Sequence, residues 1–220
     1  MKNILIFGAS GHGKVIIDIV EKENIYNISG LIDDNKNLPV DFSGYKILGV
    51  TDETLHIIKK YNIYGGIVAI GDNWIRSLVV RKIRDISPDF VFVNAIHPSA
   101  RIARNVTTGK GCVVMAGAVI NSDTRTGDFC IINTGSSVDH DNIIEDYASI
   151  APGVTTGGNV KIGSFSAVSL GASIIHGVTV GEHTVVGAGS TVLKNIPSYV
   201  VAYGTPAQVV RERQAGEKYL

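Results

Sequence analysis

The chain has 220 residues, enough for one large domain or two small domains with separate apolar cores. Its 20 Lys and Arg residues balance its 20 Asp and Glu residues, so the formal net charge is zero. A neutral chain offers no electrostatic reason to expect nucleic acid or an anionic membrane as a partner. The apolar run at the N-terminus is too short for a signal peptide or a membrane span. Cys112 and Cys130 have no CxxC spacing, so we expect a cytoplasmic protein with reduced, buried thiols.

The first half alternates short β-branched runs with helical patterns. Strands are expected at residues 4–7, 29–32, 66–70 and 90–93. Three helices are expected between them, with apolar faces formed by Val15, Ile16, Ile19 and Val20, by Leu55, Ile58 and Tyr61, and by Ile75, Leu78, Val79 and Ile83. Strands and helices that alternate through short loops predict a parallel α/β sheet, a Rossmann-like domain over residues 1–93.

Residues 94–220 follow a six-residue period. Every sixth position from Ile96 to Val192 holds Ile, Val or Thr, which gives seventeen consecutive members. Small or medium residues such as Ala118 and Cys130 stand four places after each member. This period predicts an all-β left-handed parallel β-helix of hexapeptide repeats, a narrow triangular prism whose periodic residues point to the axis. The pattern by itself fixes no oligomer, but such a prism has long exposed faces, and a homotrimer that packs prisms side by side is the usual solution in this architecture.

Several short stretches accompany the repeat, namely residues 8–13 (GASGHG), 32–34 (IDD), 69–73 (AIGDN), 133–140 (NTGSSVDH) and 204–207 (GTPA). Together they resemble the left-handed β-helix family of sialic acid O-acetyltransferases and sugar-nucleotide N-acetyltransferases, over the whole chain. That family includes UDP-N-acetylbacillosamine-type and GDP-perosamine enzymes. The resemblance implies that acetyl passes from acetyl-CoA to the amine of a nucleotide-linked amino sugar, of the UDP-4-amino-4,6-dideoxy sugar type.

His140 is the candidate general base. An amine that attacks a thioester must lose a proton, and imidazole has a suitable pKa. His140 stands between Asp139 and Asp141, and a neighbouring carboxylate would favour the imidazolium. The resemblance assigns the catalytic roles to His140 and Asp141 and implies direct transfer without an acyl-enzyme. The alternative interpretation is an exposed turn residue, since β-helix surfaces are rich in His and Asp.

The resemblance also implies how acetyl-CoA is held, in a groove between two prisms. Asn133 and the amide of Gly158 are expected near the acetyl group, where an N–H stabilises the oxyanion. Some relatives carry a second histidine nine residues after the base, and this chain departs from them with Ser149. The remaining positions that match cofactor contacts are Ser169, Leu170, Gly187, Ala188 and Lys194.

The glycine loop between the first strand and helix suits a phosphate. Its glycines admit close backbone approach, and a helix N-terminus favours an anion. The GxxGxG spacing differs from the dinucleotide GxGxxG and argues against NAD; a purely structural turn is the alternative. By the resemblance, the nucleotide of the sugar substrate contacts Ser10, Gly11, His12, Gly13, Asp33, Asp34, Gly71, Asp72 and Asn73.

Other functions fit the sequence less well. A β-helix carbonic anhydrase needs three zinc-binding histidines; His140 and His176 are two coils apart, but the place of the third is Gly181, so we expect no metal. An oxidoreductase would leave the prism a mere scaffold, and an inactive structural β-helix would not need a phosphate loop. Sialic acid O-acetylation is the nearest alternative, because the same histidine would activate a hydroxyl.

Overall fold

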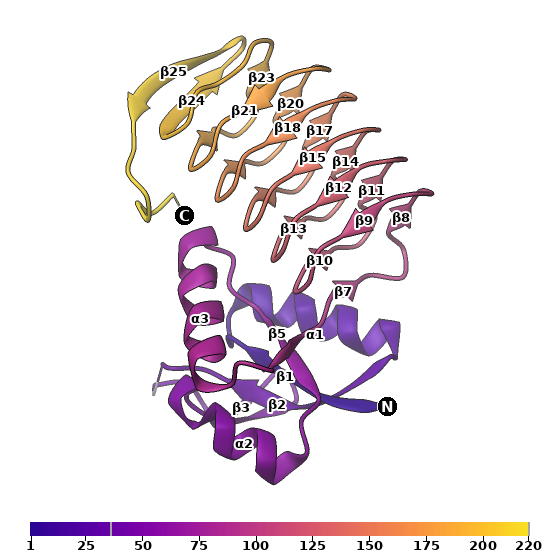
Figure 1. Cartoon of the computed structure of the whole chain (residues 1–220), viewed down its shortest axis with the longest axis vertical. Coiled ribbons are helices and arrows are strands. Elements are labelled where there is room, and N and C mark those ends of the chain that lie inside the picture. Colours follow the sequence, from indigo (N-terminus) through magenta and orange to yellow (C-terminus); the bar gives the residue numbers. More distant parts are fainter. Residues whose placement is uncertain (36, 220) are drawn as a thin grey trace. The chain divides into compact units, whose positions relative to one another are not determined.

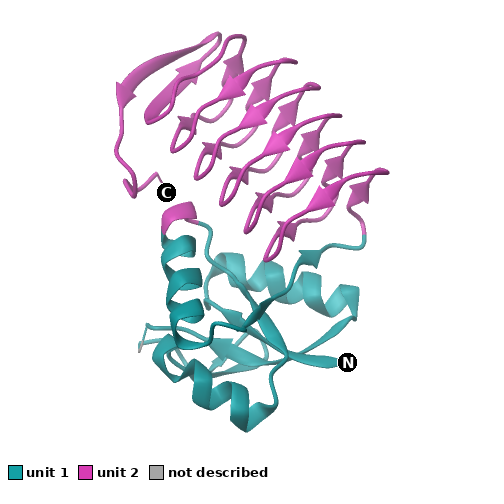
Figure 2. Cartoon of the chain, viewed as in Figure 1, with its two compact units in different colours: residues 1–71, 75–98 teal, residues 72–74, 99–220 magenta. Residues whose placement is uncertain are grey.

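The computed structural model describes residues 1–35 and 37–219. Position 36 of the predicted first domain and position 220 of the predicted second domain therefore lie outside the described residues. The chain forms two compact units, residues 1–71 with 75–98 and residues 72–74 with 99–220 (Figure 2). A boundary between residues 93 and 94 stays a prediction.

The first unit contains the expected parallel α/β sheet. Its strand order is β3-β4-β2-β1-β5-β6, and the central strands β1, β2 and β5 are parallel. Ile4, Leu5 and Ile6 of β1 are fully buried, which explains the continuous apolar run. The strands are β1 (Lys2–Phe7), β2 (Tyr26–Ile32), β3 (Asp41–Phe42), β4 (Tyr45–Gly49), β5 (Gly65–Val68) and β6 (Val91–Phe92). The helices are α1 (Gly11–Glu23), the 3₁₀ turn η1 (Thr51–Glu53), α2 (Thr54–Tyr61) and α3 (Asn73–Ile86).

All three helices pack partly differently from the sequence prediction. In α1 the predicted Val15 is 39% exposed, whereas Ile17, which was not in the predicted face, is 3% exposed. In α2 the side chain of Ile57 is 3% exposed whereas that of Leu55 is 42% exposed. In α3 Val80 is buried, while Ile75 and Leu78 are exposed. The three helices carry apolar residues on more than one side, so spacing alone does not select the side that meets the sheet. The predicted apolar faces were therefore partly wrong.

Two further local differences appear near the start of the first unit. Helix α1 begins at Gly11, so part of the predicted glycine loop belongs to the first helical turn. The antiparallel pair β3 and β4 was not expected from the sequence. Its side chains are exposed or half-buried, so no apolar pattern marks it.

The second unit is the predicted β-helix. Each of its two-residue strands ends at a member of the six-residue series, and strands 18 residues apart pair in parallel, as Val119 does with Ser137 (Figure 1). The axial side chains from Val114 onward are buried, with Ile120, Ile144 and Ile150 fully so. The strands of the second unit that follow the series are β8 (Arg101–Ile102), β9 (Thr107–Thr108), β10 (Val113–Val114), β11 (Val119–Ile120), β12 (Arg125–Thr126), β13 (Ile131–Ile132), β14 (Ser137–Val138), β15 (Ile143–Ile144), β16 (Ser149–Ile150), β17 (Thr155–Thr156), β18 (Lys161–Ile162), β19 (Ala167–Val168), β20 (Ser173–Ile174), β21 (Thr179–Val180), β22 (Val185–Val186) and β23 (Thr191–Val192). The first strand of the series, β7 (Ala95–Ile96), falls within the first unit.

Three stacked sheets form the faces of the prism. One contains β22-β19-β16-β13-β10, the next β23-β20-β17-β14-β11-β8, and the third β21-β18-β15-β12-β9. From Cys112 onward, the residues four places after each axial residue are also buried, as Cys112, Cys130 and Ser136 show. An antiparallel pair, β24 (Val200–Gly204) and β25 (Ala207–Glu212), adds to the first face through β22. No helix in the described ranges is long and apolar enough to cross a membrane.

A ladder of aromatic rings lines one corner of the prism and was not foreseen. Phe129, Tyr147, Phe165, His183 and Tyr199 stack with ring centroids 4.6–5.0 Å apart. The first four recur every 18 residues, so each ring lies on the ring of the next coil. Stacked rings of this kind reinforce the register of successive coils.

Candidate active site

The coil length of 18 residues sorts the predicted catalytic and cofactor residues into two corners of the prism. His140, Gly158, His176 and Lys194 recur at that interval after the face that contains β14; we call this the His140 corner. The Asn133 corner lies before β14 and contains the predicted positions Asn133, Ser169, Leu170, Gly187 and Ala188. The structure therefore does not gather all these residues at one point of a single prism.

The predicted base and its acid are in direct contact. His140 Nδ1 lies 2.7 Å from Asp141 Oδ2, and both side chains are about half exposed. The hydrogen bond to Asp141, together with the charges of both neighbouring carboxylates, raises the pKa of His140 above its ordinary value. An ionised carboxylate only accepts, so Nδ1 donates and Nε2 keeps the lone pair that can take a proton.

The backbone around His140 is held by polar groups that the sequence analysis missed. Asp139 Oδ1 accepts from the His140 amide at 2.9 Å and from Asn121 Nδ2 at 3.0 Å, and these bonds lower the pKa of Asp139. The buried Asn142 amide donates to the Asp139 carbonyl at 3.0 Å and to Thr156 Oγ1 at 2.7 Å. The sequence carries one sign of these contacts. Asn142 is polar and larger than most residues at the same position of the repeat.

Gly158 lets the His140 ring lie against the next coil. A Cβ at residue 158 would be 2.4 Å from His140 Cε1 and 2.6 Å from Nε2. Real Cβ atoms do not approach other atoms so closely, so a side chain would displace the ring. The Gly158 backbone is thus beside the nitrogen that would take the proton.

The Asn133 corner offers an exposed apolar and amide surface. Leu170 is 57% exposed, and Asn133 Oδ1 accepts from the Thr134 amide at 2.8 Å. Ser149 lies half-buried in β16, the strand that leads into this corner. The contacts of these residues with coenzyme A remain predictions.

In the first unit, a pocket of about 210 Å³ opens at the carboxyl ends of β1 and β2. Its walls are mainly apolar, and Asp33, Asp34 and Thr51 supply polar groups; the other lining residues are Phe7, Gly8, Ile32, Ile70, Ile75 and Val79. Ligands of open parallel sheets bind at this edge. The structure thus brings the predicted Asp33 and Asp34 to a suitable cavity.

The two acids have different partners. Asp33 accepts through Oδ2 from the Ala9 amide at 2.6 Å and through Oδ1 from the Asn35 amide at 2.8 Å, which fixes the glycine loop. Asp34 accepts from the Thr51 amide at 2.6 Å and lies 3.6 Å from Lys82 Nζ. Desolvation acts to raise the pKa of Asp34, but the bond from Thr51 and the charge of Lys82 lower it overall.

The start of α1 combines a close backbone contact with a buried imidazole. A Cβ on Gly13 would lie 2.6 Å from the Gly8 carbonyl oxygen, so only glycine fits there. Ser10 and Gly11 are exposed beside it. Burial, and secondarily the Arg76 guanidinium, lowers the pKa of His12 to about 4, so this ring is neutral at pH 7. Its Nε2 is buried without a hydrogen-bond partner among the described residues.

The predicted contacts at residues 71–73 are partly occupied by the protein itself. The Gly71 carbonyl accepts from Arg76 at 2.9 Å. Residues 72–74 belong to the second unit, where Asn73 is buried and its amide donates to the Ser166 and Phe165 carbonyls at 3.1 and 3.3 Å. The side chain of Asn73 therefore serves packing; contacts of Gly71, Asp72 and Asn73 with substrate remain predictions.

The zinc alternative has no further support. His176 is exposed in the His140 corner. In residues 1–35 and 37–219 no group of three or more His, Cys, Asp or Glu side chains is placed to hold a metal ion.

Comparison with known proteins addresses both units. The PglD N-terminal domain family matches residues 3–83. The structure superposes with a TM-score of 0.88 on PerB from Caulobacter crescentus in complex with CoA and GDP-perosamine, at 36% identity over 96% of this chain and 98% of that chain. A histidine-to-asparagine mutant of perosamine N-acetyltransferase from C. crescentus, also in complex with CoA and GDP-perosamine, gives 0.89 and 35% with the same coverage.

The chain belongs to the left-handed β-helix family of sugar-nucleotide N-acetyltransferases. Another family structure, the acetyltransferase domain of PglB from Neisseria gonorrhoeae FA1090, matches with a TM-score of 0.87 and 28% identity over 96% of this chain and all of that one. UDP-N-acetylbacillosamine N-acetyltransferase of Bacillus subtilis (strain 168) is 34% identical over 118 residues, 53% of this chain. The match spans about half of that relative, 52% of its length.

Proposed function

We propose that this chain transfers the acetyl group of acetyl-CoA to the amine of a nucleotide-linked amino sugar. The observation that carries the proposal is the contact of His140 Nδ1 with Asp141, which leaves Nε2 as a base at the surface of a prism of this family. Two similar structures hold CoA and GDP-perosamine together, and one similar enzyme is named for a UDP-linked sugar.

The reaction needs one base and no covalent enzyme intermediate. The amine nitrogen attacks the thioester carbonyl, and His140 Nε2 removes a proton from the amine. The new N–C bond forms first and gives a tetrahedral oxyanion. Its collapse breaks the C–S bond, and the proton passes from His140 to the leaving thiolate. Asp141 would stabilise the imidazolium through its bond to Nδ1, and the amide of Gly158, a residue that lies against the His140 ring, is the proposed donor to the oxyanion.

Acetyl-CoA is proposed to bind between two prisms of a homotrimer. In one chain, β14 separates the His140 corner from the Asn133 corner, so cofactor contacts from both corners require a second copy. The exposed Leu170 would pack on the apolar part of the pantetheine arm. Ser149, Ser169, Gly187, Ala188 and Lys194 are the remaining proposed contacts.

The nucleotide is proposed to bind the first unit. Its base would enter the pocket between Asp34 and Val79, and its diphosphate would lie on the glycine loop at the start of α1. A neutral His12 can donate a hydrogen bond to phosphate without adding charge. The free, buried thiols of Cys112 and Cys130 support a cytoplasmic location.

The test is thiol release from acetyl-CoA with a panel of UDP-, GDP- and dTDP-linked amino sugars and with sialic acid. We expect turnover with at least one nucleotide-linked amino sugar, with the acetyl group on nitrogen in the product. Turnover restricted to a sialic acid hydroxyl, or none with any acceptor, would refute the proposal.

A further inference from the structure

Residues 213–219, which we call the strap, follow β25 and contact residues 72–74 within the second unit. Figure 2 draws the first turn of α3 in the colour of the prism, next to the strap. The strap is an ordered turn. The amide of Gln214 donates to Glu217 Oε2 at 3.1 Å, and the amide of Glu217 donates to the Gln214 carbonyl at 3.2 Å. Glu217 Oε1 also lies 2.6 Å from Arg211 Nη1, so the turn is fixed to β25.

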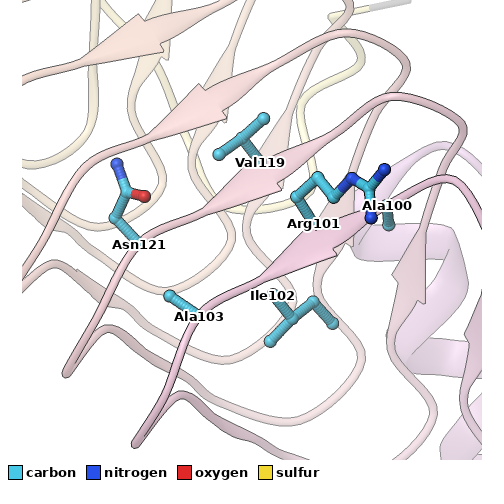
Figure 3. Close-up of a pocket in the computed structure, with 6 residues that line it drawn as sticks. All are labelled: Ala100, Arg101, Ile102, Ala103, Val119 and Asn121. Atoms are coloured by element: carbon cyan, nitrogen blue, oxygen red, sulfur yellow. The ribbon is translucent and has the colours of Figure 1, made fainter.

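Arg213 anchors the strap to the prism. Its residue is only 6% exposed, its Nη1 donates to the His183 carbonyl at 2.8 Å, and its amide donates to the Tyr199 carbonyl at 2.8 Å. Its Nη2 donates to the Glu217 carbonyl inside the strap. Arginines on the faces of the prism differ from it: Arg101 of β8 is exposed beside a shallow surface pocket (Figure 3). Arg213 therefore joins the strap to the aromatic corner of the prism.

The strap also holds the start of α3. The Tyr219 hydroxyl accepts from the Asn73 amide at 3.2 Å. Gly216 has a left-handed φ of 76°, and a Cβ there would lie 2.8 Å from Trp74 Nε1, so a larger residue would push against the indole. The Trp74 ring centroid is 5.7 Å from that of Phe165 in the aromatic ladder. Trp74 therefore contacts both the strap and the prism.

The closed strap combines favourable contacts with one unfavourable feature. The negative charges of Glu217 and Asp72 act on the Arg213 guanidinium and favour the closed arrangement. Arg213 Nε, in contrast, is buried without a hydrogen-bond partner among the described residues. A buried donor without an acceptor costs stability. Because this cost offsets part of the gain, the loss of one contact should be enough to open the strap in a measurable fraction of the molecules.

We propose that the strap positions Asp72 and Asn73 for the sugar nucleotide, with Arg213 and Tyr219 as positioning residues. The assignment rests on the proposed function and on the predicted contacts of Asp72 and Asn73 with that substrate. With the strap open, the Asn73 amide loses its acceptor, and the cost of ordering this segment falls on substrate binding. The proposed acetyl-CoA contacts lie in the His140 and Asn133 corners, whereas the strap is bonded to the aromatic corner.

The first experiment detects the strap directly in the full chain. Trp74 is the single tryptophan of the sequence, so the intrinsic fluorescence excited at the indole band reports its surroundings alone. Arg213→Gln and Gly216→Val should shift the Trp74 emission to longer wavelength and increase its quenching by acrylamide, because an open strap exposes the ring to water. Arg101→Gln is the matched control, since it removes an exposed arginine from another part of the prism, and it should change neither property.

The second experiment measures the effect on the substrate, with the UDP- or GDP-linked amino sugar that gives turnover in the panel above. Tyr219→Phe removes one acceptor and should raise the KM for this substrate about threefold, and Arg213→Gln should raise it about tenfold or more. The KM for acetyl-CoA should stay unchanged in both variants. Tyr199→Phe is the control for Tyr219→Phe, because Tyr199 stacks on His183 in the same corner and its hydroxyl interacts with Glu182.

The third experiment tests the coupling between substrate and strap. If the sugar nucleotide binds better when the strap is closed, its binding must in turn favour the closed strap by the same factor. A saturating concentration of the sugar nucleotide should therefore return the acrylamide quenching of Trp74 in Tyr219→Phe to the wild-type value. Acetyl-CoA alone should leave this quenching unchanged.

The outcomes separate this assignment from the general function. Unchanged Trp74 fluorescence in Arg213→Gln, Gly216→Val and Tyr219→Phe overturns the strap itself. Changed fluorescence with an unchanged sugar-nucleotide KM in an active enzyme overturns its positioning role alone, as does an equal rise of both KM values, which indicates a general loss of structure. Absence of turnover with every amino sugar refutes the proposed function, whereas Trp74 fluorescence still decides whether the strap holds residues 72–74.

Discussion

Gly158→Ala should separate catalysis from folding. The new Cβ would meet His140 Cε1 at 2.4 Å, Nε2 at 2.6 Å and Nδ1 at 3.0 Å, so the ring must move by roughly 1 Å to reach ordinary contact. The ring is the end of a half-exposed side chain and moves at little cost to stability. Gly158 does not have a left-handed φ, so alanine suits the backbone.

The displaced ring loses its alignment with Asp141 and with the amine. A misplacement of this size costs about 10²-fold in rate, or about 2.7 kcal/mol in the barrier. We expect kcat to fall by that factor while the KM for acetyl-CoA changes little and the free energy of unfolding changes by less than about 1 kcal/mol. Thiol release at saturating substrates and thermal unfolding measure the two effects.

A double-mutant cycle shows whether the effect passes through His140. In a His140→Ala background, where no ring is present, Gly158→Ala should lower kcat no further. A Gly158→Ala enzyme with more than half of the wild-type kcat would refute the stacked geometry. So would an equal loss in both backgrounds, because glycine would then act independently of the imidazole.

Other predictions concern the same site. His140→Ala should lower kcat by about 10² or more with little change in acetyl-CoA affinity, measured by steady-state kinetics and calorimetry. His176→Ala should keep most of its activity, and EDTA should not inhibit; inhibition would revive the zinc alternative. The value of kcat/KM should fall as pH is lowered, because protonation of His140 removes the base, and the midpoint should lie above pH 6.5, because the bond to Asp141 raises the pKa of His140. Asp141→Asn removes that charge and should move the midpoint to lower pH. Light scattering should report three times the 23.4 kDa chain mass, and a fully active monomer would contradict the two-prism site.

The architecture of the second unit could be derived from the sequence because its period is strict. The axial series from Ile96 to Val192 coincides with the strand ends of the structure. Coil length is three periods, so positions 140 and 158 fall in one column by arithmetic. The resemblance indicated His140 and Gly158 separately. The structure adds that the His140 ring lies against Gly158.

The missed features depend on contacts that periodicity does not encode. Asn73 donates to Phe165 and Ser166, which are 92 and 93 residues away, so no local pattern could indicate its burial. Leu55 and Ile57 both fit an apolar helix face, and only packing decides between them. Asn121 occupies an ordinary turn position of the repeat, and its role emerges only from the bond to Asp139.

The repeat also explains how a catalytic pair fits into the prism without disturbing it. The position of Asp141 has a left-handed backbone in successive coils, with φ of 63° at Asp123, 58° at Asp141 and 57° at Asn159. Aspartate and asparagine tolerate this conformation better than other residues with a side chain. Asp141 therefore forms the turn that the coil requires, and its carboxylate is then one residue from the imidazole that it orients. Asp141→Asn removes the charge but keeps the turn. Asp141→Ala would add about 1–2 kcal/mol of backbone strain, so a loss of activity in that variant could not be distinguished from a loss of stability. A loss of activity in Asp141→Asn without a loss of stability thus isolates the electrostatic part of the pair.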